Sequence, residues 1–196
     1  LRASVVLACG GFQGNARMMR THFGAGAETM RLISPGTRFN TGDGIEMGLA
    51  AFKKYCMVRV EALNHALRNI AEESIRYHLC WGSWHGPHAF DLPLADIVDV
   101  MLAVKAKFYS FEAANVRHEH EYRLWERVSL PPGKVIMPGV VTHSTDLIEH
   151  PELVSERIQR FARLVGPGRV IASCDCGFGG RTHPQIAWAK LRALSE

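Results

Sequence analysis

From about residue 77 onward the sequence alternates between short strand-like and longer helix-like segments, and this alternation most restricts the possible fold. Strands are predicted where aromatic and β-branched residues cluster in short runs, at residues 77–81, 108–112, 134–141 and 169–173. Helices are predicted where apolar residues recur every three to four positions, at residues 94–106, 119–128, 151–164 and 184–194. About four strand-helix units in a row predict an α/β fold with a parallel sheet and right-handed crossovers.

The number of units indicates a partial TIM-type (β/α) barrel. A complete barrel has eight such units in about 250 residues, and this chain of 196 residues shows about half of them. Pro151 stands where a helix tolerates proline, in the first turn, and the Gly-Pro-Gly run at residues 166–168 ends the same helix. We therefore expect a half-barrel.

The first 50 or so residues have a different character. A buried-type strand at residues 5–12 runs into a glycine turn, and a polar turn at residues 40–44 leads into a helix-like segment at residues 45–52. The turn residues are candidates for close approach to a phosphate or ribose, with tight turning as the alternative: Gly10, Gly11, Gly42, Asp43 and Gly44. We expect two parts, residues 1–55 with a short α/β segment and residues 56–196 with the half-barrel.

Composition excludes several classes of protein. The chain is 47% hydrophobic and 21% charged, which is typical of a globular protein, and a net charge of +4 without a basic patch gives no support for nucleic-acid binding. No apolar run approaches the roughly 20 residues of a membrane span. Five cysteines, an odd number, favour a reducing compartment and thiols that act as ligands. The expected location is the cytoplasm.

Four residues at strand ends form a candidate metal site. His78 and Cys80 are two positions apart, and the strand period of two turns both to one face. Glu112 ends the second predicted strand, and Cys176 follows the fourth. One imidazole, one carboxylate and two thiolates form a ligand set that suits zinc. Because parallel sheets bind ligands at the carboxyl ends of their strands, this placement favours a catalytic site.

Two alternatives stay open for these residues. A cysteine is often a small buried apolar side chain, and a single histidine on a strand is more often packed or solvated than bound to metal. Cys174 and Cys176 share a strand face, so either is compatible with the last ligand position; Cys176 is favoured because it lies nearer the strand end.

Residues from about 58 to the end resemble the C-terminal catalytic barrel of cobalamin-independent methionine synthases. The likeness rests on four motifs that follow the family's order: His78-Leu-Cys80, Phe111-Glu112, Gly139-Val-Val-Thr-His-Ser144 and Asp175-Cys176-Gly177. The resemblance implies a zinc ion on the four candidate ligands that binds a thiol such as homocysteine. It also implies a folate-type methyl donor and a proton delivered by His143, for which an exposed loop histidine is the alternative. His85, His88, His118 and His120 are expected to be solvated.

Residues 3 to about 51 resemble a segment of the FAD-binding domain of flavoproteins of the fumarate reductase and succinate dehydrogenase type. This likeness rests on Ala8-Cys-Gly-Gly-Phe12 and Asn40-Thr-Gly-Asp-Gly44. Because the dinucleotide fingerprint is absent, we do not expect FAD to bind.

Three functions compete at this point. The first is zinc-dependent methyl transfer to a thiol; under this reading, the truncated barrel is either active or inactive. The others are a fragment of an FAD-dependent oxidoreductase and a non-catalytic zinc-binding protein. Open sheet edges also predict self-association, for which a homodimer is one form; the alternative is that the first 58 or so residues pack against the half-barrel and shield it.

Overall fold

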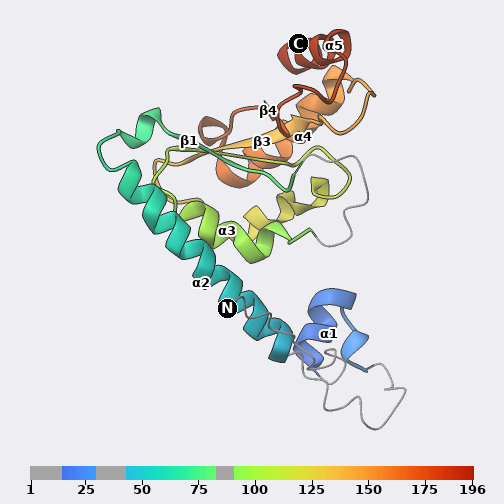
Figure 1. Cartoon of the computed structure of the whole chain (residues 1–196). Coiled ribbons are helices and arrows are strands. Elements are labelled where there is room, and N and C mark those ends of the chain that lie inside the picture. The colour runs from blue at the N-terminus through green and yellow to red at the C-terminus, as the bar shows by residue number, and fades with distance from the viewer. Residues whose placement is uncertain (1–14, 30–42, 83–90) are drawn as a thin grey trace. The chain divides into compact units, whose positions relative to one another are not determined.

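The computed structural model describes residues 15–29, 43–82 and 91–196 (Figure 1). Contacts within the chain divide it into two compact units, Leu1–Arg59 and Val60–Glu196. The long helix α2 (Asp43–Ala66) contributes residues to both units, and the boundary predicted after residue 55 falls inside it.

The described part of the first unit is helical. Helix α1 (Ala16–Phe23) begins after Asn15, whose side-chain oxygen accepts a hydrogen bond of 3.1 Å from the amide of Met18, and a short 3-10 helix, η1 (Ala27–Thr29), follows. The strand predicted at residues 5–12 lies outside the described residues, and so do Gly10, Gly11 and Gly42.

The helix predicted at residues 45–52 is wrong in its length. Helix α2 begins at Asp43, takes in Gly44, and continues to Ala66. Residues 53–66 contain neither glycine nor proline and are mostly good helix formers, so nothing in the local sequence ends the helix at residue 52.

The second unit is built on a four-stranded parallel sheet, which confirms the predicted α/β class. The strands, after a short 3-10 turn η3 (Glu72–Ser74), are β1 (Arg76–Leu79), β2 (Phe108–Phe111), β3 (Val135–Val141) and β4 (Ser173–Cys174). They lie in the order β1-β2-β3-β4. The register places His78 of β1 opposite Ser110 of β2 and Phe111 of β2 opposite Pro138 of β3.

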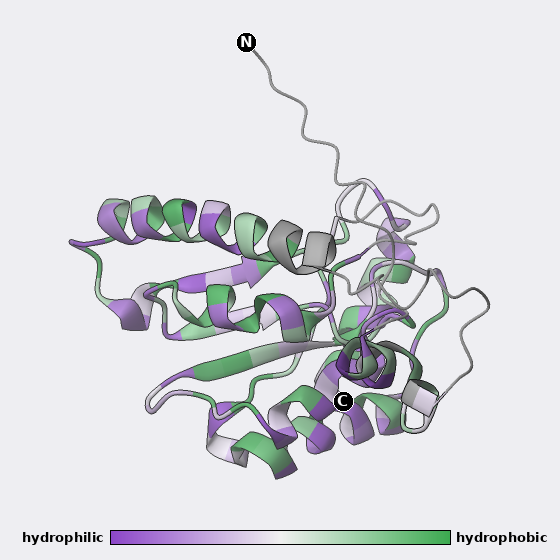
Figure 2. Ribbon diagram, turned by 90° about the horizontal axis from the view of Figure 1, so that it is seen from below, coloured by the Kyte–Doolittle hydropathy of each residue, from purple (hydrophilic) through white to green (hydrophobic). Residues whose placement is uncertain are grey.

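The two central strands carry the core. Tyr109, Phe111, Ile136, Val140 and Val141 are all nearly or fully buried. Strand β3 is hydrophobic along most of its length (Figure 2), as expected for a parallel strand with covered faces.

Helices follow three of the strands. They are α3 (Leu94–Leu102) after β1, α4 (Pro151–Val165) after β3, and α5 (Pro184–Ser195) after β4 (Figure 1). Helix α4 packs Val154 against Val140 and Val141 of the sheet, and its Phe161 ring lies edge-on to Phe111 with centroids 6.0 Å apart. The strand-helix succession is that of a partial (β/α) barrel.

Helix α3 is shorter than the predicted 94–106. It ends at Leu102 because Asn64 of α2 takes over the next backbone groups: its amide donates to the carbonyl of Ala103 at 3.0 Å, and its carbonyl accepts from the amide of Lys105 at 2.8 Å.

The segment predicted as a helix at residues 119–128 is the 3-10 helix η4 (Glu119–Glu126). Its acidic side chains bind distant partners: Glu119 accepts hydrogen bonds from Arg157, and Glu121 accepts one of 2.8 Å from the amide of Leu94. These tertiary contacts override the helical periodicity.

The fourth strand is also shorter than predicted, and it begins later. Arg169 ends a 3-10 turn, η5 (Pro167–Arg169), and its guanidinium bonds to the carbonyls of Leu130, Pro131 and Lys134. The pairing of β3 with β4 is irregular between Gly139 and Val141, next to Pro138, which has no amide hydrogen to donate. Among the helices in the described part of the chain, none is long and apolar enough to cross a membrane.

Candidate metal centre

His78 presents one ring nitrogen as a possible ligand. Its Nδ1 lies 2.8 Å from the hydroxyl of Ser110 on the neighbouring strand, whereas its Nε2 is buried without a hydrogen-bond partner among the described residues. Burial lowers the pKa of His78, and the charge of Arg76 adds to this effect. A neutral ring with its Nδ1 hydrogen-bonded to an oxygen leaves the Nε2 lone pair available for a metal.

Two sulfur atoms lie near the ring of His78. Cys80, just beyond β1, and Cys176, just beyond β4, have their Sγ atoms 3.7 Å apart, and the ligand atoms of His78, Cys80 and Cys176 lie within 4.8 Å of one another. Two thiolates on a tetrahedral zinc, with Zn–S bonds of about 2.3 Å, are about 3.8 Å apart. The sulfur spacing therefore fits zinc.

Cys174 is not a member of this group. It lies in β4, and burial raises the pKa of its thiol. Cys174, the alternative to Cys176 as a ligand, is thus a half-buried thiol that favours its protonated form.

Glu112 follows β2, and its carboxylate lies near the sulfur of Cys80. Its Oε1 is 3.6 Å from the Sγ of Cys80 and accepts a hydrogen bond of 3.2 Å from the amide of Trp81. The side chain is buried, which raises the pKa of Glu112, and the nearby charge of Asp175 raises it further. A bound cation would favour the ionised carboxylate at this position.

Two further buried polar residues, which the sequence did not single out as site residues, connect these ligands. Asp175 accepts hydrogen bonds from the amides of Ala113 and Ala114, at 2.7 and 2.8 Å, with one carboxylate oxygen. Asn115 donates to Glu112 at 2.9 Å and to the other oxygen of Asp175 at 3.1 Å. The position of Asp175 directly before Cys176 was the one available signal in the sequence.

His143 is fully buried, so the alternative of an exposed loop histidine is wrong. It comes two residues after β3, the strand that lies between β2 and β4, and its carbonyl accepts a hydrogen bond of 3.3 Å from Thr182. His143 thus lies beyond the carboxyl end of β3, at the end of the sheet where His78, Cys80 and Cys176 come together.

His118 is also buried, which corrects the expectation that it is solvated. Its ring centroid lies 4.1 Å from that of Trp81, the residue after Cys80, with the two rings tilted by 31°, and its Nδ1 lies 2.8 Å from Glu121. Trp81 in turn donates to the carbonyl of Leu92 at 2.7 Å. His120 is exposed as expected, and His85 and His88 lie outside the described residues.

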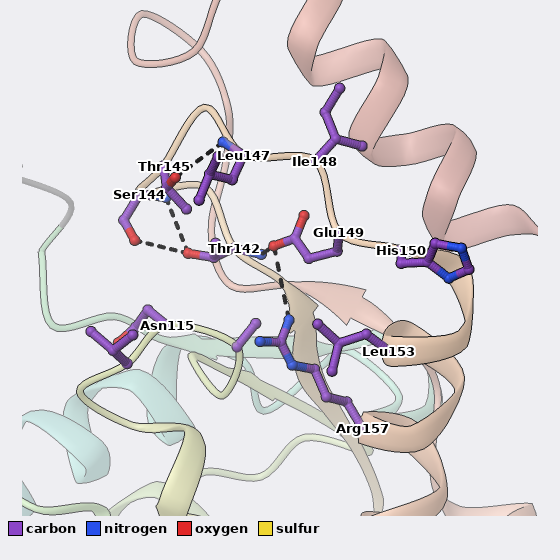
Figure 3. A pocket seen from close by; sticks show the side chains of 12 residues that line it. Asn115, Thr142, Ser144, Thr145, Leu147, Ile148, Glu149, His150, Leu153 and Arg157 are labelled. Atoms are coloured by element: carbon purple, nitrogen blue, oxygen red, sulfur yellow. Dashed lines mark hydrogen bonds and ion pairs between the residues drawn. The ribbon is translucent and has the colours of Figure 1, made fainter.

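A cavity of about 520 Å³ opens beside the candidate metal centre (Figure 3). Its walls come from the segment after β2, the segment after β3 and the start of α4. Asn115 lines this cavity and also contacts Glu112, so the cavity adjoins the ligand set. Inside it, Figure 3 shows Glu149 pointing toward Arg157, with their charged atoms 3.9 Å apart.

The loop between β3 and α4 is held by a buried ion pair. Glu149 accepts a hydrogen bond of 2.8 Å from the amide of Thr142, the residue before His143, and a second of 2.9 Å from Lys190 of α5. Lys190 is fully buried and also donates to the carbonyl of Leu147. These contacts fix the backbone on both sides of His143.

The residues predicted to approach a phosphate or ribose all belong to the first unit of the chain. Gly10, Gly11 and Gly42 are outside the described residues, and Asp43 and Gly44 form the first turn of α2.

Comparison with known proteins gives similarity in fold. No protein-family model matches the sequence, and no curated protein matches it. Solved structures do match. One is a B12-independent methionine synthase from Shewanella sp. W3-18-1 in complex with selenomethionine, with 22% identity and a TM-score of 0.58 over 69% of this chain and 40% of that one. Another, from Listeria monocytogenes, is assigned as a vitamin-B12 independent methionine synthase, with 20% identity and a TM-score of 0.47 over 69% of this chain and 37% of that one.

The chain therefore spans about 40% of the length of the Shewanella protein and shares its fold over that part. The resemblance of residues 3–51 to an FAD-binding domain has no support in these comparisons.

Proposed function

We propose that the chain belongs to the cobalamin-independent methionine synthase family and that His78, Cys80, Glu112 and Cys176 hold a zinc ion for methyl transfer to a thiol. One observation carries the metal site: the two sulfur atoms are 3.7 Å apart, the edge length of a tetrahedral zinc site, with an imidazole nitrogen and a carboxylate oxygen beside them. The reducing cytoplasm is the location that keeps these thiols free.

When bound, zinc lowers the pKa of a thiol ligand and so supplies a thiolate nucleophile at neutral pH. Glu112 is suited to the ligand position that an incoming thiol replaces, because its Oε2 stays bonded to Asn115 when Oε1 is released. Cys80 and Cys176 would hold the zinc as thiolates. Their charge would leave the substrate sulfur electron-rich, which favours attack on a methyl carbon.

In the transfer, the sulfur of the thiol forms a bond to the methyl carbon as the bond from that carbon to the donor nitrogen breaks. We assign His143 as the group that protonates the departing amine, because it lies at the carboxyl end of β3 and its backbone is fixed on both sides. The resemblance to the family implies that the thiol is homocysteine and that the donor is a folate-type methylamine. The cavity beside Asn115 offers room for substrate.

Metal analysis tests the site directly. The purified chain should contain about one zinc per chain, and Cys80→Ser or Cys176→Ser should remove most of it. Cys174→Ser and Cys56→Ser are matched controls that should keep the metal, since neither belongs to the group of three ligands. Full zinc content in both ligand variants would refute the site.

Activity is a separate question from metal binding. A chain that binds zinc but produces no methylated homocysteine from a methyl-folate donor would be a non-catalytic zinc-binding protein. A stoichiometric flavin absorption spectrum after gel filtration would instead favour the flavoprotein alternative; we expect none.

A further inference from the structure

We propose that Asp175, Asn115 and Gly139 are positioning residues of the metal centre: Asp175 reaches over strand β3 at Gly139 and, together with Asn115, holds Glu112 and Cys176 at ligand spacing. This inference rests on the proposed zinc site. It concerns metal binding and does not depend on whether the chain catalyses methyl transfer.

Asp175 ties together two segments that are not neighbours in the sheet. It follows β4, whereas the amides of Ala113 and Ala114 follow β2, and β3 lies between these strands. The backbone amide of Asp175 is itself fixed to β3 by a hydrogen bond of 2.9 Å to the carbonyl of Val141. The carboxylate is fully buried, and two of its contacts are with the residues directly after Glu112.

Gly139 makes this reach possible. A Cβ atom at residue 139 would lie 2.6 Å from the Cα of Asp175 and 2.7 Å from its nitrogen, closer than non-bonded atoms approach. Only glycine lets the segment after β4 lie this close to β3.

Asn115 completes the connection. Its single amide nitrogen has two hydrogens, and it donates one to Oε2 of Glu112 at 2.9 Å and the other to Oδ2 of Asp175 at 3.1 Å. Its carbonyl oxygen accepts from the amide of Arg117 at 3.1 Å, which fixes the orientation of the amide. Glu112 is thereby held with Oε2 on Asn115 and Oε1 facing Cys80.

The chemical reason for such a connection is the mutual repulsion of the ligands. Both thiols lose their protons when they bind a metal, and the two thiolates and the carboxylate then repel one another; a carboxylate with one oxygen anchored cannot rotate away. Asp175 is bonded to Cys176 through the backbone and hydrogen-bonded to the residues after Glu112. It therefore fixes the positions of Cys176 and Glu112 relative to one another.

The test compares Asn115→Ala with Asn64→Ala in the 196-residue chain. Asn64 is a matched control because it also makes two hydrogen bonds, to Ala103 and Lys105, but it does so before β2, at the opposite end of the sheet. Two readouts are used: zinc affinity by competition with a chromophoric chelator, and the visible spectrum of the cobalt-substituted protein, which reports the geometry of the ligands.

Asn115→Ala should bind zinc about 10 to 100 times more weakly than the parent chain, with a changed cobalt spectrum. Asn64→Ala should lose stability in urea but keep the parent affinity and spectrum. If Asn115→Ala does not fold, Asp175→Asn replaces it. That variant keeps an oxygen for the amides of Ala113 and Ala114 but turns an NH₂ group toward Asn115, so the same loss of affinity is expected.

Parent-like zinc affinity and cobalt spectrum in the folded Asn115 or Asp175 variant would overturn the inference while the zinc site stands. A parent chain that binds no zinc would overturn the zinc site as well, and the two failures are therefore distinguishable.

Discussion

Replacing Gly139 by alanine tests how closely β3 and the segment after β4 must approach. The new methyl group would lie 2.6 Å from the Cα of Asp175 and closer still to its Oδ1. Because ordinary van der Waals contact begins at 3.4 Å, restoring such contact with the Cα requires the two segments to separate by 0.8 Å. The hydrogen bonds from Ala113 and Ala114 to Asp175 measure 2.7 and 2.8 Å. A separation of that size in their direction stretches both to the limit of a hydrogen bond.

Two energetic effects then combine. Inserting a methyl group into a closely packed site costs about 1–3 kcal/mol. A hydrogen bond to a buried charged group contributes about 1.5–3 kcal/mol, and part of two such bonds is lost. We therefore expect Gly139→Ala to lower the free energy of unfolding by about 3 kcal/mol or more, a large share of the roughly 5–15 kcal/mol of a typical domain.

Urea unfolding followed by circular dichroism measures this loss, in the presence of a chelator so that metal binding does not contribute. Gly168→Ala is the matched control, because a Cβ at Gly168 meets no atom within 4 Å and its backbone does not need glycine. It should change the unfolding free energy by no more than about 0.5 kcal/mol. A loss below about 1 kcal/mol in Gly139→Ala would refute the close-approach argument.

Three other outcomes are expected. Glu149→Ala should lower the free energy of unfolding by about 3–5 kcal/mol, since it leaves the fully buried Lys190 without its charge partner. The double variant Glu149→Leu with Lys190→Met should lose much less than the two single variants together. Additive losses in urea unfolding would contradict the pairing. Burial raises the pKa of Tyr109, so the unfolded chain ionises first and stability should fall as pH rises above about 10. Tyr109→Phe should lower the free energy of unfolding by about 1 kcal/mol at pH 7, because the variant lacks the hydrogen bond to Val104. It should also reduce the fall in stability at high pH, and an unchanged slope of unfolding free energy against pH would contradict this. Within the described residues, β1 and β4 are the edge strands of the sheet, and unpaired edges predict a dimer in light scattering; a monomer with cooperative unfolding would show that the edges need no partner.

The sequence predicted the first three strands of the sheet because each is a short apolar run that no local contact disturbs. It predicted His78, Cys80 and Cys176 as neighbours in space because parallel strands deliver their carboxyl ends to one edge, and the structure does bring these three together. It failed at η4, where the conformation depends on contacts of Glu119 and Glu121 with residues far along the chain.

The sequence also left Asp175 and Asn115 unassigned, for a similar reason. Their contacts join positions about 60 residues apart, and nothing in the composition of either segment indicates which carboxylate an amide will meet. An aspartate next to a cysteine reads equally well as a solvated turn residue.

The spacing of the two cysteines places a demand on the whole sheet. Neighbouring strands lie about 4.8 Å apart, so residues at the ends of β1 and β4, three strands apart, would be about 14 Å apart in a flat sheet. Their sulfur atoms are 3.7 Å apart. Side chains alone do not span that difference, and therefore the segments after the strands must bend toward one another as they do in a closed barrel.

The hydrogen bond between Asp175 and the amide of Ala113 holds the segment after β4 close to the segment after β2. The absence of a side chain at Gly139 leaves room for Asp175 to make this approach. A sheet with the same four strands but a larger residue at position 139 would still contain the four ligand residues, but their side chains would no longer lie close enough together to share a metal ion. The proposed metal centre thus depends on strand β3, which supplies none of the four proposed ligands, as much as on the strands that do.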